Sequence, residues 1–444
     1  MRMRVAGELV CWGWCFTLAL GASACVRSLD DEGLGAVDAG AGSGPGGAGG
    51  TGGTGGSPGS AGSGGTLGYG YPRDAGRYEP PPPPPTCPTQ PDGPDAALQS
   101  IPAVYPDNFW GSVVEGISAD GRTVVGRMSE GTFDGRYPSS RQRAFRWTLE
   151  EGAVPLDVPP SSGDSSAFAA SADGSVIVGE VVPSVDRDYN HAVVWRSGVL
   201  SELEELEGQV GSRAVAVNDD GTVIAGFQFN ISTDGLGQPR RIPVRWTAAG
   251  VEVLTRGAGE ALATDVSGDG AKFAGFGGTY PLHALRWSAV DSVTELLLPD
   301  AREHYAYAIS RDGSVVVGAV GSAFDAQFEA FRWQGSETEL LGMQLALGVD
   351  ADGSTIVGVT EGTALVWDRP HGVRQLSRVV DGLGADLSTW TLKSADAVSA
   401  DGRTIAGNGY CGTSDRAFLA RLPADEAEVG SADAGDAGPD ANTP

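Results

Sequence analysis

The chain has 444 residues, of which 57 are acidic and 30 are Lys or Arg, so its formal net charge is −27. This excess of negative charge argues against nucleic acid as a partner, because binding to a phosphate backbone requires clustered Lys and Arg. It also argues against attachment to anionic lipid by charge alone. The 68 Gly and 27 Pro residues are clustered rather than spread, and such clusters mark segments that cannot bury a hydrophobic core.

Residues 1–24 form a predicted signal peptide for export. Two arginines precede an apolar stretch at 9–20, which is too short to span a bilayer as a stable helix. The following residues, GASAC at 21–25, resemble the bacterial lipobox. This resemblance implies that Cys25 is acylated, becomes the mature N-terminus and anchors the protein in a lipid bilayer. The alternative is an ordinary secretory signal, cleaved after the same small residues without lipidation.

Residues 25–97 are a predicted disordered tether, because they combine a Gly/Ser-rich tract with a proline run at 80–85. A long spacer behind an acylated cysteine would hold a domain away from a membrane. Val26 stands where inner-membrane lipoproteins often carry Asp, and this analogy favours the outer membrane or the cell surface. Residues 424–444 are acidic and lack aromatic side chains, which predicts a second disordered segment.

Between these segments, at 98–423, one sequence pattern occurs seven times. Each copy opens with Ser, Asn or Asp and has Asp-Gly two residues later. Another Gly follows five residues after the first, as in SADGRTVVG at 118–126. The Asp-Gly glycines recur every 40 to 53 residues, a period typical of repeat architectures. The aspartates of the seven copies are Asp120, Asp173, Asp220, Asp269, Asp312, Asp352 and Asp401.

This pattern predicts a tight turn, because Ser, Asn and Asp side chains bond to backbone N–H groups and Gly adopts a positive φ. We therefore interpret the seven aspartates as structural turn residues. A calcium site is the alternative, but one carboxylate per unit around a ring cannot supply the roughly six to eight oxygens that calcium needs. The later Gly predicts a close approach of two backbones near a strand end, or a β-bulge.

Three further segments in each unit are also predicted to be short strands, rich in Val, Ile and Phe. One of them ends in Trp in six units and in Ala420 in the seventh. Four strands per unit of this length predict an all-β fold, a seven-bladed β-propeller of four-stranded blades. No stretch shows helical periodicity, which excludes helical repeats. The tryptophans are predicted to pack between blades rather than to bind sugars.

The last unit lacks its final strand, and a matching segment, ALQSI at 97–101, precedes the first unit. We predict that this N-terminal strand completes the last blade. Of the five cysteines, Cys87 lies just before the closing strand and Cys411 lies within the last unit. In an oxidising compartment these two are expected to form a disulfide bond. The alternative is two free thiols.

Two motifs carry a family resemblance. HAVVW at 191–195 and SADGRTVVG at 118–126 resemble the His-Ala-Phe (HAF) extracellular bacterial repeat, and the Asp-Gly segment also looks like the repeat of TolB-type periplasmic propellers. The resemblance covers nearly all of 98–423 and implies an exported protein, without implying a molecular role. The motif's histidine is kept only at His191 and His283, so the resemblance does not extend to a histidine-dependent function.

The sequence contains no nucleophile elbow, Cys/His metal cluster or phosphate-binding loop. We therefore predict no enzymatic activity, no catalytic residue, no metal and no cofactor. The connection before the Trp strand is longest in units 1 and 3, where it carries Arg and aromatic residues. Variable loops on a rigid scaffold often bind ligands, so this rim is a candidate site for a glycan or protein; solvated loop charge is the alternative. The candidate residues are Arg136, Tyr137, Arg141, Phe229, Arg240 and Arg241.

These features predict a monomeric cell-envelope lipoprotein, exported and lipid-anchored at the outer membrane or cell surface. It would present the propeller as a binding or scaffolding module. Two alternatives stay open: a propeller enzyme acting on polysaccharide, as a lyase or glycosidase, and a purely structural envelope protein. An enzyme would require carboxylates, His or Tyr that depart from the repeat and converge at one mouth of the central channel.

Overall fold

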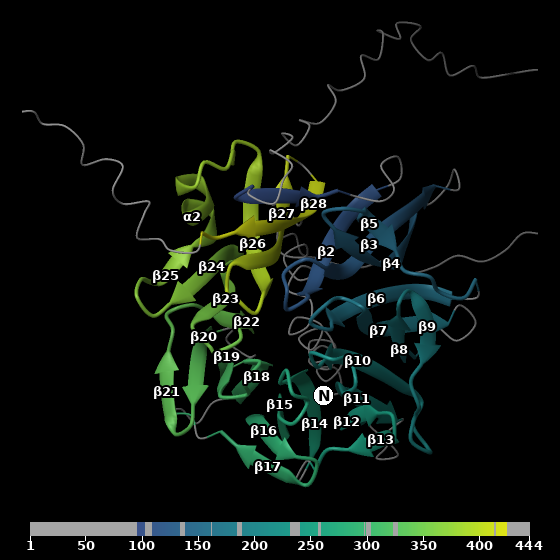
Figure 1. Ribbon diagram of the computed structural model, residues 1–444. Helices are drawn as coiled ribbons and strands as arrows, with labels where there is room; N and C mark the ends of the chain where they lie inside the picture. Colours follow the sequence, from purple (N-terminus) through teal and green to yellow (C-terminus); the bar gives the residue numbers. More distant parts are fainter. Residues whose placement is uncertain are drawn as a thin grey trace, which may run out of the picture. The chain divides into compact units, whose positions relative to one another are not determined.

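In the computed structural model, seven small sheets are arranged around a common centre (Figure 1). Each sheet has four antiparallel strands, which confirms the predicted all-β, seven-bladed propeller. The structure describes residues 96–102, 109–133, 138–160, 162–183, 189–230, 240–255, 259–296, 298, 303–322, 327–412 and 414–423.

In six of the blades, the strand order within the sheet follows the order of the sequence, and the first strand of each blade lines the centre. Blade 1 consists of β2 (Phe109–Ile117), β3 (Val124–Phe133), β4 (Pro138–Thr148) and β5 (Gly152–Pro155). Blade 2 consists of β6 (Ser162–Ala170), β7 (Val176–Pro183), β8 (His191–Arg196) and β9 (Val199–Glu202). Blade 3 consists of β10 (Gly211–Val217), β11 (Ile224–Asn230), β12 (Arg240–Thr247) and β13 (Gly250–Val253).

The next three blades repeat this plan. Blade 4 consists of β14 (Glu260–Val266), β15 (Phe273–Gly278), β16 (His283–Ala289) and β17 (Ser292–Glu295). Blade 5 consists of β18 (Glu303–Ile309), β19 (Val315–Ser322), β20 (Gln327–Gln334) and β21 (Glu337–Leu340). Blade 6 consists of β22 (Leu345–Val349), β23 (Thr355–Thr360), β24 (Thr363–Asp368) and β25 (Gly372–Gln375).

Blade 7 joins the two ends of the ordered chain. It consists of β26 (Trp390–Val398), β27 (Thr404–Cys411), β28 (Ser414–Arg421) and, as its outermost strand, β1 (Leu98–Ile101). β1 pairs with β28 in antiparallel register, with Leu98 opposite Ala420 and Ile101 opposite Ala417. The predicted closure by the N-terminal strand is therefore confirmed, and the ring is sealed by backbone hydrogen bonds between its two ends.

One element was not predicted. A short helix, α2 (Leu376–Gly382), connects β25 to β26, and its buried Leu376 and Val380 pack into the core of blades 6 and 7. Seven residues are too few for helical periodicity to emerge in the windows of about 11–18 residues that reveal it. Within the ranges that the structure describes, no helix is both long enough and apolar enough to cross a membrane.

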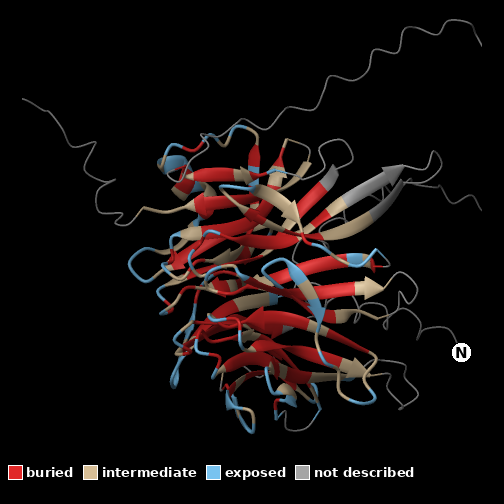
Figure 2. Cartoon of the chain, turned by 45° about the vertical axis from the view of Figure 1, so that its right-hand side comes forward, coloured by how far each residue is buried: buried red, intermediate tan, exposed pale blue. Residues whose placement is uncertain are grey.

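Burial follows the strands, and exposed residues gather at the turns (Figure 2). The tryptophans of the repeat pack between blades, as predicted: buried Trp195 of blade 2 contacts a cluster that includes Val125 and Ala144 of blade 1. Its indole N–H donates to the backbone oxygen of Asp157 at 2.7 Å, in the segment that links the two blades. Trp195, like Trp246 and Trp287, thus fills an apolar gap and satisfies its own polar atom.

Every innermost strand contains a β-bulge at the same place, three residues before the opening residue of the Asp-Gly turn. Opposite the bulge lies the second Gly of the repeat pattern. In blade 1, Gly126 pairs with Val114, and the next pair, Val125 with Gly116, leaves Glu115 unpaired. A Cβ at Gly126 would lie 2.0 Å from the carbonyl oxygen of Val113. The later Gly therefore serves both predicted purposes, because the bulge brings a carbonyl so close that only hydrogen fits.

Candidate functional site: the central channel

The Asp-Gly turns are built alike in all seven blades. In blade 1 the Ser118 hydroxyl donates to Asp120 Oδ1 at 2.6 Å and accepts from the N–H of Thr123 at 2.9 Å. Asp120 Oδ1 also accepts from the N–H of Arg122 at 3.0 Å, and Gly121 has φ +71°. In every other blade the corresponding aspartate accepts from the N–H two residues later. The carboxylates are thus engaged by their own turns, the arrangement of an Asx-turn.

These turns are also hydrogen-bonded to one another in a closed ring. Each blade is joined to the next by a backbone bond between neighbouring turns, so one mouth of the channel is a continuous rim. The seven bonds, of 2.8–3.1 Å, run from Asp120 N to Ala172 O, Ala172 N to Asp219 O, Asp219 N to Gly268 O, Gly268 N to Arg311 O, Asp312 N to Ala351 O, Ala351 N to Ala400 O and Ala400 N to Ala119 O.

Behind this rim lies a cavity of about 210 Å³. The seven bulged residues all line it, because a bulge turns the extra residue out of the alternation of its strand. Three blades place an apolar side chain there and four place a side chain with a polar group. The bulged residues, in blade order, are Glu115, Phe168, Val215, Thr264, Tyr307, Leu347 and Asp396.

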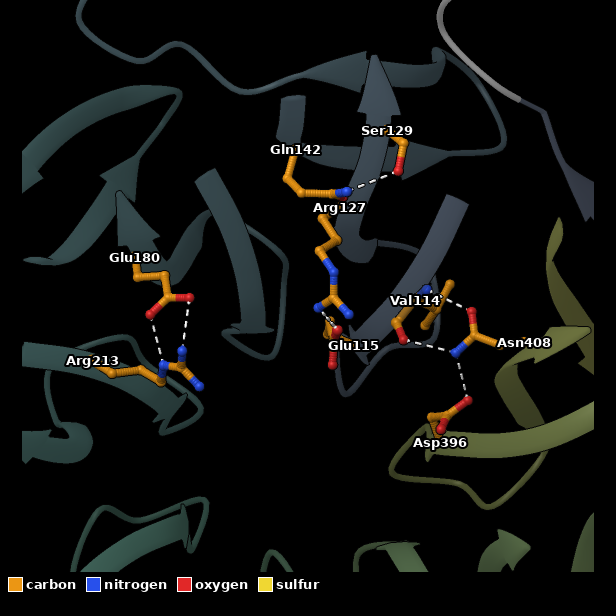
Figure 3. A network of polar contacts seen from close by, with 9 residues as sticks. All are labelled: Val114, Glu115, Arg127, Ser129, Gln142, Glu180, Arg213, Asp396 and Asn408. Carbon is orange, nitrogen blue, oxygen red and sulfur yellow. Dashed lines mark hydrogen bonds and ion pairs between the residues drawn. The ribbon is translucent and has the colours of Figure 1, made fainter. Parts of the chain in front are cut away.

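Two of the carboxylates sit on adjacent blades at the seam of the ring (Figure 3). Glu115, whose side chain is 9% exposed, forms an ion pair with Arg127 of β3. Asp396 Oδ2 accepts from the Ser394 hydroxyl at 2.7 Å and from Asn408 Nδ2 at 2.8 Å. Burial raises the pKa of Glu115 to about 7 and that of Asp396 to about 6, although Arg127 lowers both. Part of each carboxyl population is therefore protonated near neutral pH.

Asn408 connects these carboxylates to the seam itself. Its Oδ1 accepts from the N–H of Val114 at 2.8 Å, and its Nδ2 donates to the carbonyl oxygen of Val114 at 3.0 Å and to Asp396 (Figure 3). One side chain of blade 7 thus satisfies both backbone groups of a residue in blade 1. The asparagine links the closure of the ring to the wall of the channel.

A third carboxylate, Asp265, lies next to the bulge of blade 4 and lines the same cavity. Its two oxygens accept from the N–H groups of Val266 and Ile309, each at 2.8 Å. Burial raises its pKa to about 7 against the lowering effect of those bonds. Because Ile309 belongs to blade 5, Asp265 holds two blades together as well as facing the channel.

A further ion pair lies close to the lining residues, and the aromatic side chains of Phe168 and Tyr307 form part of the wall. Glu180 of β7 accepts two bonds from Arg213 of β10, at 2.6 and 3.0 Å (Figure 3). The Arg213 guanidinium also lies 5.2 Å from the centre of the Phe168 ring. On β18 of blade 5, Tyr305 and Tyr307 lie with ring centres 6.2 Å apart and nearly parallel, at 12°. Burial raises the pKa of Tyr307, so its hydroxyl stays protonated across the physiological range.

The candidate rim residues do not meet in a comparable way. Arg141 Nε donates to the carbonyl oxygen of Gly163 in blade 2 at 2.7 Å, and Arg241 lies 3.7 Å from Glu260 in blade 4. Both arginines therefore link their blade to the next one. Phe229 stands 6.1 Å from the ring of Tyr189, and Arg240 is exposed. Arg136 and Tyr137 lie outside the described residues, as do Cys25 and Cys87, so ligand binding at the rim, acylation and the disulfide stay predictions.

The two motif histidines and Cys411 have structural surroundings. His191 Nδ1 lies 2.9 Å from Glu205, and His283 Nδ1 lies 2.9 Å from Glu295. Cys411 is buried in β27, with its sulfur 3.5 Å from the Thr389 hydroxyl. Among the residues that the structure describes, no group of three or more His, Cys, Asp or Glu side chains could hold a metal ion.

Sequence reasoning did not single out the channel residues. An alignment of the seven units with one another could have identified them. Glu115 and Asp396 stand three residues before the opening Ser, at the position that Val215 and Leu347 occupy in other units. A polar side chain that replaces an apolar one at a fixed repeat position needs its own explanation. Four such replacements around one cavity make the channel the candidate site.

Comparison with known proteins gives likeness of fold only. No protein-family model and no curated protein matches this chain. Among solved structures, an oligogalacturonate lyase in complex with manganese is 13% identical, with a TM-score of 0.47 over 75% of this chain and 95% of that one. TolB from Acinetobacter baumannii is 13% identical, with a TM-score of 0.39 over 68% and 64%. The β-propeller domain of the trilobed protease from Pyrococcus furiosus is 10% identical, with a TM-score of 0.46 over 70% and 95%.

Proposed function

We propose that this chain is an exported, lipid-anchored envelope protein whose propeller binds a small ligand in its central channel without chemical turnover. The observation that carries this proposal is the convergence of Glu115, Thr264, Tyr307 and Asp396 on one cavity from four separate blades. The fold does not require these side chains, because Phe168, Val215 and Leu347 occupy the same bulge position elsewhere.

The size of the cavity supports a small ligand rather than a polymer. Sites for drug-sized molecules typically enclose about 300–1,000 Å³, and this cavity encloses about 210 Å³. The continuous rim of turns surrounds one mouth of this cavity. A compact molecule fits such a space better than a polysaccharide chain, which makes the channel a more specific candidate than a glycan-binding rim.

The decisive experiment blocks the channel without changing its charge. In Leu347→Trp the added side-chain volume enters the cavity from a bulge position, so ligand binding should be lost whatever the ligand. The readout is the ligand-induced shift in melting temperature of the purified full chain against a metabolite and glycan panel. A quadruple variant, with Arg136, Arg141, Arg240 and Arg241 each changed to Ala, serves as the comparison. If only the quadruple variant loses binding, the rim is the site and the channel proposal is wrong.

An enzyme is the second candidate, because Glu115, Tyr307 and Asp396 depart from the repeat and converge. A carboxyl with a pKa of about 7 suits general acid–base catalysis, which typically contributes about 10²–10⁴-fold. Incubation with acidic and neutral oligosaccharides, followed by product analysis, tests this candidate. Glu115→Gln should then lower turnover by at least about 100-fold, whereas the absence of product from the unmodified chain removes the enzyme hypothesis.

The envelope location rests on the predicted lipobox and tether. Cys25→Ser should move the protein from the membrane fraction to the soluble fraction if Cys25 is acylated, and should leave it soluble in both forms if the signal is an ordinary secretory one. Non-reducing peptide mapping tests the proposed Cys87–Cys411 bond. A linked peptide supports an exported, oxidised protein, and two free thiols contradict it.

A further inference from the structure

The charges of the channel wall do not balance. Among the described residues that line the cavity, Glu115, Asp265 and Asp396 carry carboxylates and Arg311 carries a guanidinium group. Arg127 pairs with Glu115, and Arg213 pairs with Glu180. At the rim, Arg311 pairs with Asp219. The excess is therefore negative, and it lies at Asp265 and Asp396.

These two carboxylates differ in what already satisfies them. Both oxygens of Asp265 accept from backbone N–H groups, which fix it as part of the scaffold. The side-chain bonds to Asp396 come from neutral donors, the Ser394 hydroxyl and the Asn408 amide, and both reach the same oxygen, Oδ2. A backbone hydrogen bond from Asn408 also lowers the pKa of Asp396. A buried carboxylate next to a cavity gains most from a cation there, because attraction is stronger in a low-dielectric surrounding than in water.

Apart from Thr264, Asp265, Arg311 and Asn408, the side chains that line the rest of the cavity are apolar or aromatic. At the bulge level, Phe168 follows Glu115 around the ring and Leu347 precedes Asp396, while Tyr307 stands on blade 5. Aromatic faces attract cations, and apolar walls favour a hydrocarbon body. The cavity thus combines an acidic wall at the seam of blades 7 and 1 with apolar and aromatic side chains from blades 2, 3, 5 and 6. The separation of acidic from apolar surface favours a ligand that has a cationic group at one end and a hydrocarbon body at the other.

We infer that the channel binds a small organic cation, with its ammonium group between Glu115 and Asp396 and a compact hydrocarbon body against Phe168, Leu347 and Tyr307. A bare divalent cation fits less well, because calcium takes about six to eight oxygens and both oxygens of Asp265 are already engaged. This inference rests on the proposed function and names the ligand class for that same site.

The test uses three probes of one shape and different charge: cyclohexylammonium, cyclohexanol and cyclohexanecarboxylate. Isothermal titration of the purified full chain should show binding of cyclohexylammonium, at least about tenfold weaker binding of cyclohexanol and none of the carboxylate. Asp396→Asn should weaken cyclohexylammonium binding by at least about tenfold. Asp291→Asn, an exposed aspartate in the turn between β16 and β17, is the matched control and should leave affinity unchanged.

A second variant keeps the inference testable if Asp396→Asn unfolds, with melting temperature as the check. Leu347→Ala retains every carboxylate and widens the cavity on β22, the strand next to β26. It should raise the affinity for a bulkier probe, adamantylammonium, relative to cyclohexylammonium. Equal binding of cyclohexanol and cyclohexylammonium, or preferential binding of calcium, would overturn the organic cation.

The same experiments distinguish a wrong ligand class from a wrong binding site. If cyclohexylammonium does not bind but Leu347→Trp abolishes binding of another panel ligand, the cation class is wrong and the channel remains the site. If Leu347→Trp changes binding of no ligand that the unmodified chain binds, both proposals are wrong.

Discussion

The seven Asp-Gly turns and the seven bulge positions form two rings in this propeller. The turns are nearly the same in every blade, whereas the bulge positions differ from blade to blade. The Asp-Gly turns are nearly identical in sequence and in hydrogen bonding, from Asp120 to Asp401. The bulge positions, three residues before each turn opens, hold seven different residue types in seven blades. The turns are repeated because every blade must meet its neighbours in the same way. The bulge positions are free to vary because they face a cavity, and this is where the polar residues gather.

The bulges depend on the glycines opposite them. Replacing one of these glycines should therefore cause the largest loss of stability. In Gly318→Ala the new Cβ would lie 1.9 Å from the carbonyl oxygen of Tyr305, so the strands of blade 5 must separate. We expect a loss of at least about 4 kcal/mol in the free energy of unfolding, measured by urea denaturation. Gly382→Ala, at the end of α2 with open space around it, is the control and should change stability by less than about 1 kcal/mol. Equal losses would mean that the close approach of the two backbones does not explain why this glycine recurs in all seven units.

The next largest loss of stability is expected from a substitution at the seam between blades 7 and 1. Asn408→Ala removes three hydrogen bonds and leaves the buried N–H and C=O of Val114 without their partner. The expected loss is about 2–4 kcal/mol. Gln142→Ala removes a part-exposed bond to Ser129 within blade 1 and should cost less than about 1 kcal/mol. If the two variants have the same melting temperature, Asn408 does not stabilise the seam, which the β1–β28 pairing and the rim bond from Ala400 to Ala119 then hold.

The two rings should also respond to pH with opposite signs. The pKa of Glu115 is raised from 4.5 to about 7, so the folded chain holds more protons than the unfolded chain between these values. Stability therefore falls as pH rises through this window, by at most about 1.4 kcal/mol per pH unit for each such carboxyl. Hydrogen bonds from Ser175 lower the pKa of Asp173 below 3.8, so its contribution is present above that pH and is lost as pH falls.

Matched variants separate these contributions in unfolding experiments from pH 3 to pH 8. Glu115→Gln should flatten the decline between about pH 5 and pH 7, and Asp173→Asn should leave that decline intact while reducing the loss of stability below about pH 4. A decline that is as steep in Glu115→Gln as in the unmodified chain would show that Glu115 titrates normally.

The contrast between the rings also explains what the sequence could predict. Seven copies of one pattern, each with Asp-Gly and a later Gly, predict the seven blades, because repetition strengthens a weak local signal. The strand that the seventh copy lacks predicts how the ring is closed. The channel was missed because strand alternation assigns faces by a period of two, and a bulge adds one residue and shifts the face. Glu115 and Asp396 therefore lie on a face that simple alternation does not identify. Helix α2 was missed because its seven residues are fewer than the window in which helical periodicity can be recognised.

The smallest expected effect completes the comparison at the turns. Asp352 Oδ1 accepts from the N–H of Ser354 at 3.0 Å, and an asparagine oxygen can accept the same bond. Its charge also raises the pKa of neighbouring Asp350, whose main shift comes from burial. Asp352→Asn keeps the bond and removes this repulsion, so the free energy of unfolding should change by less than about 0.5 kcal/mol. Asp352→Ala loses the bond and should cost about 1 kcal/mol. A large loss in the asparagine variant would mean that the negative charge itself is needed at the rim, and the turns would then share in function with the channel beneath them.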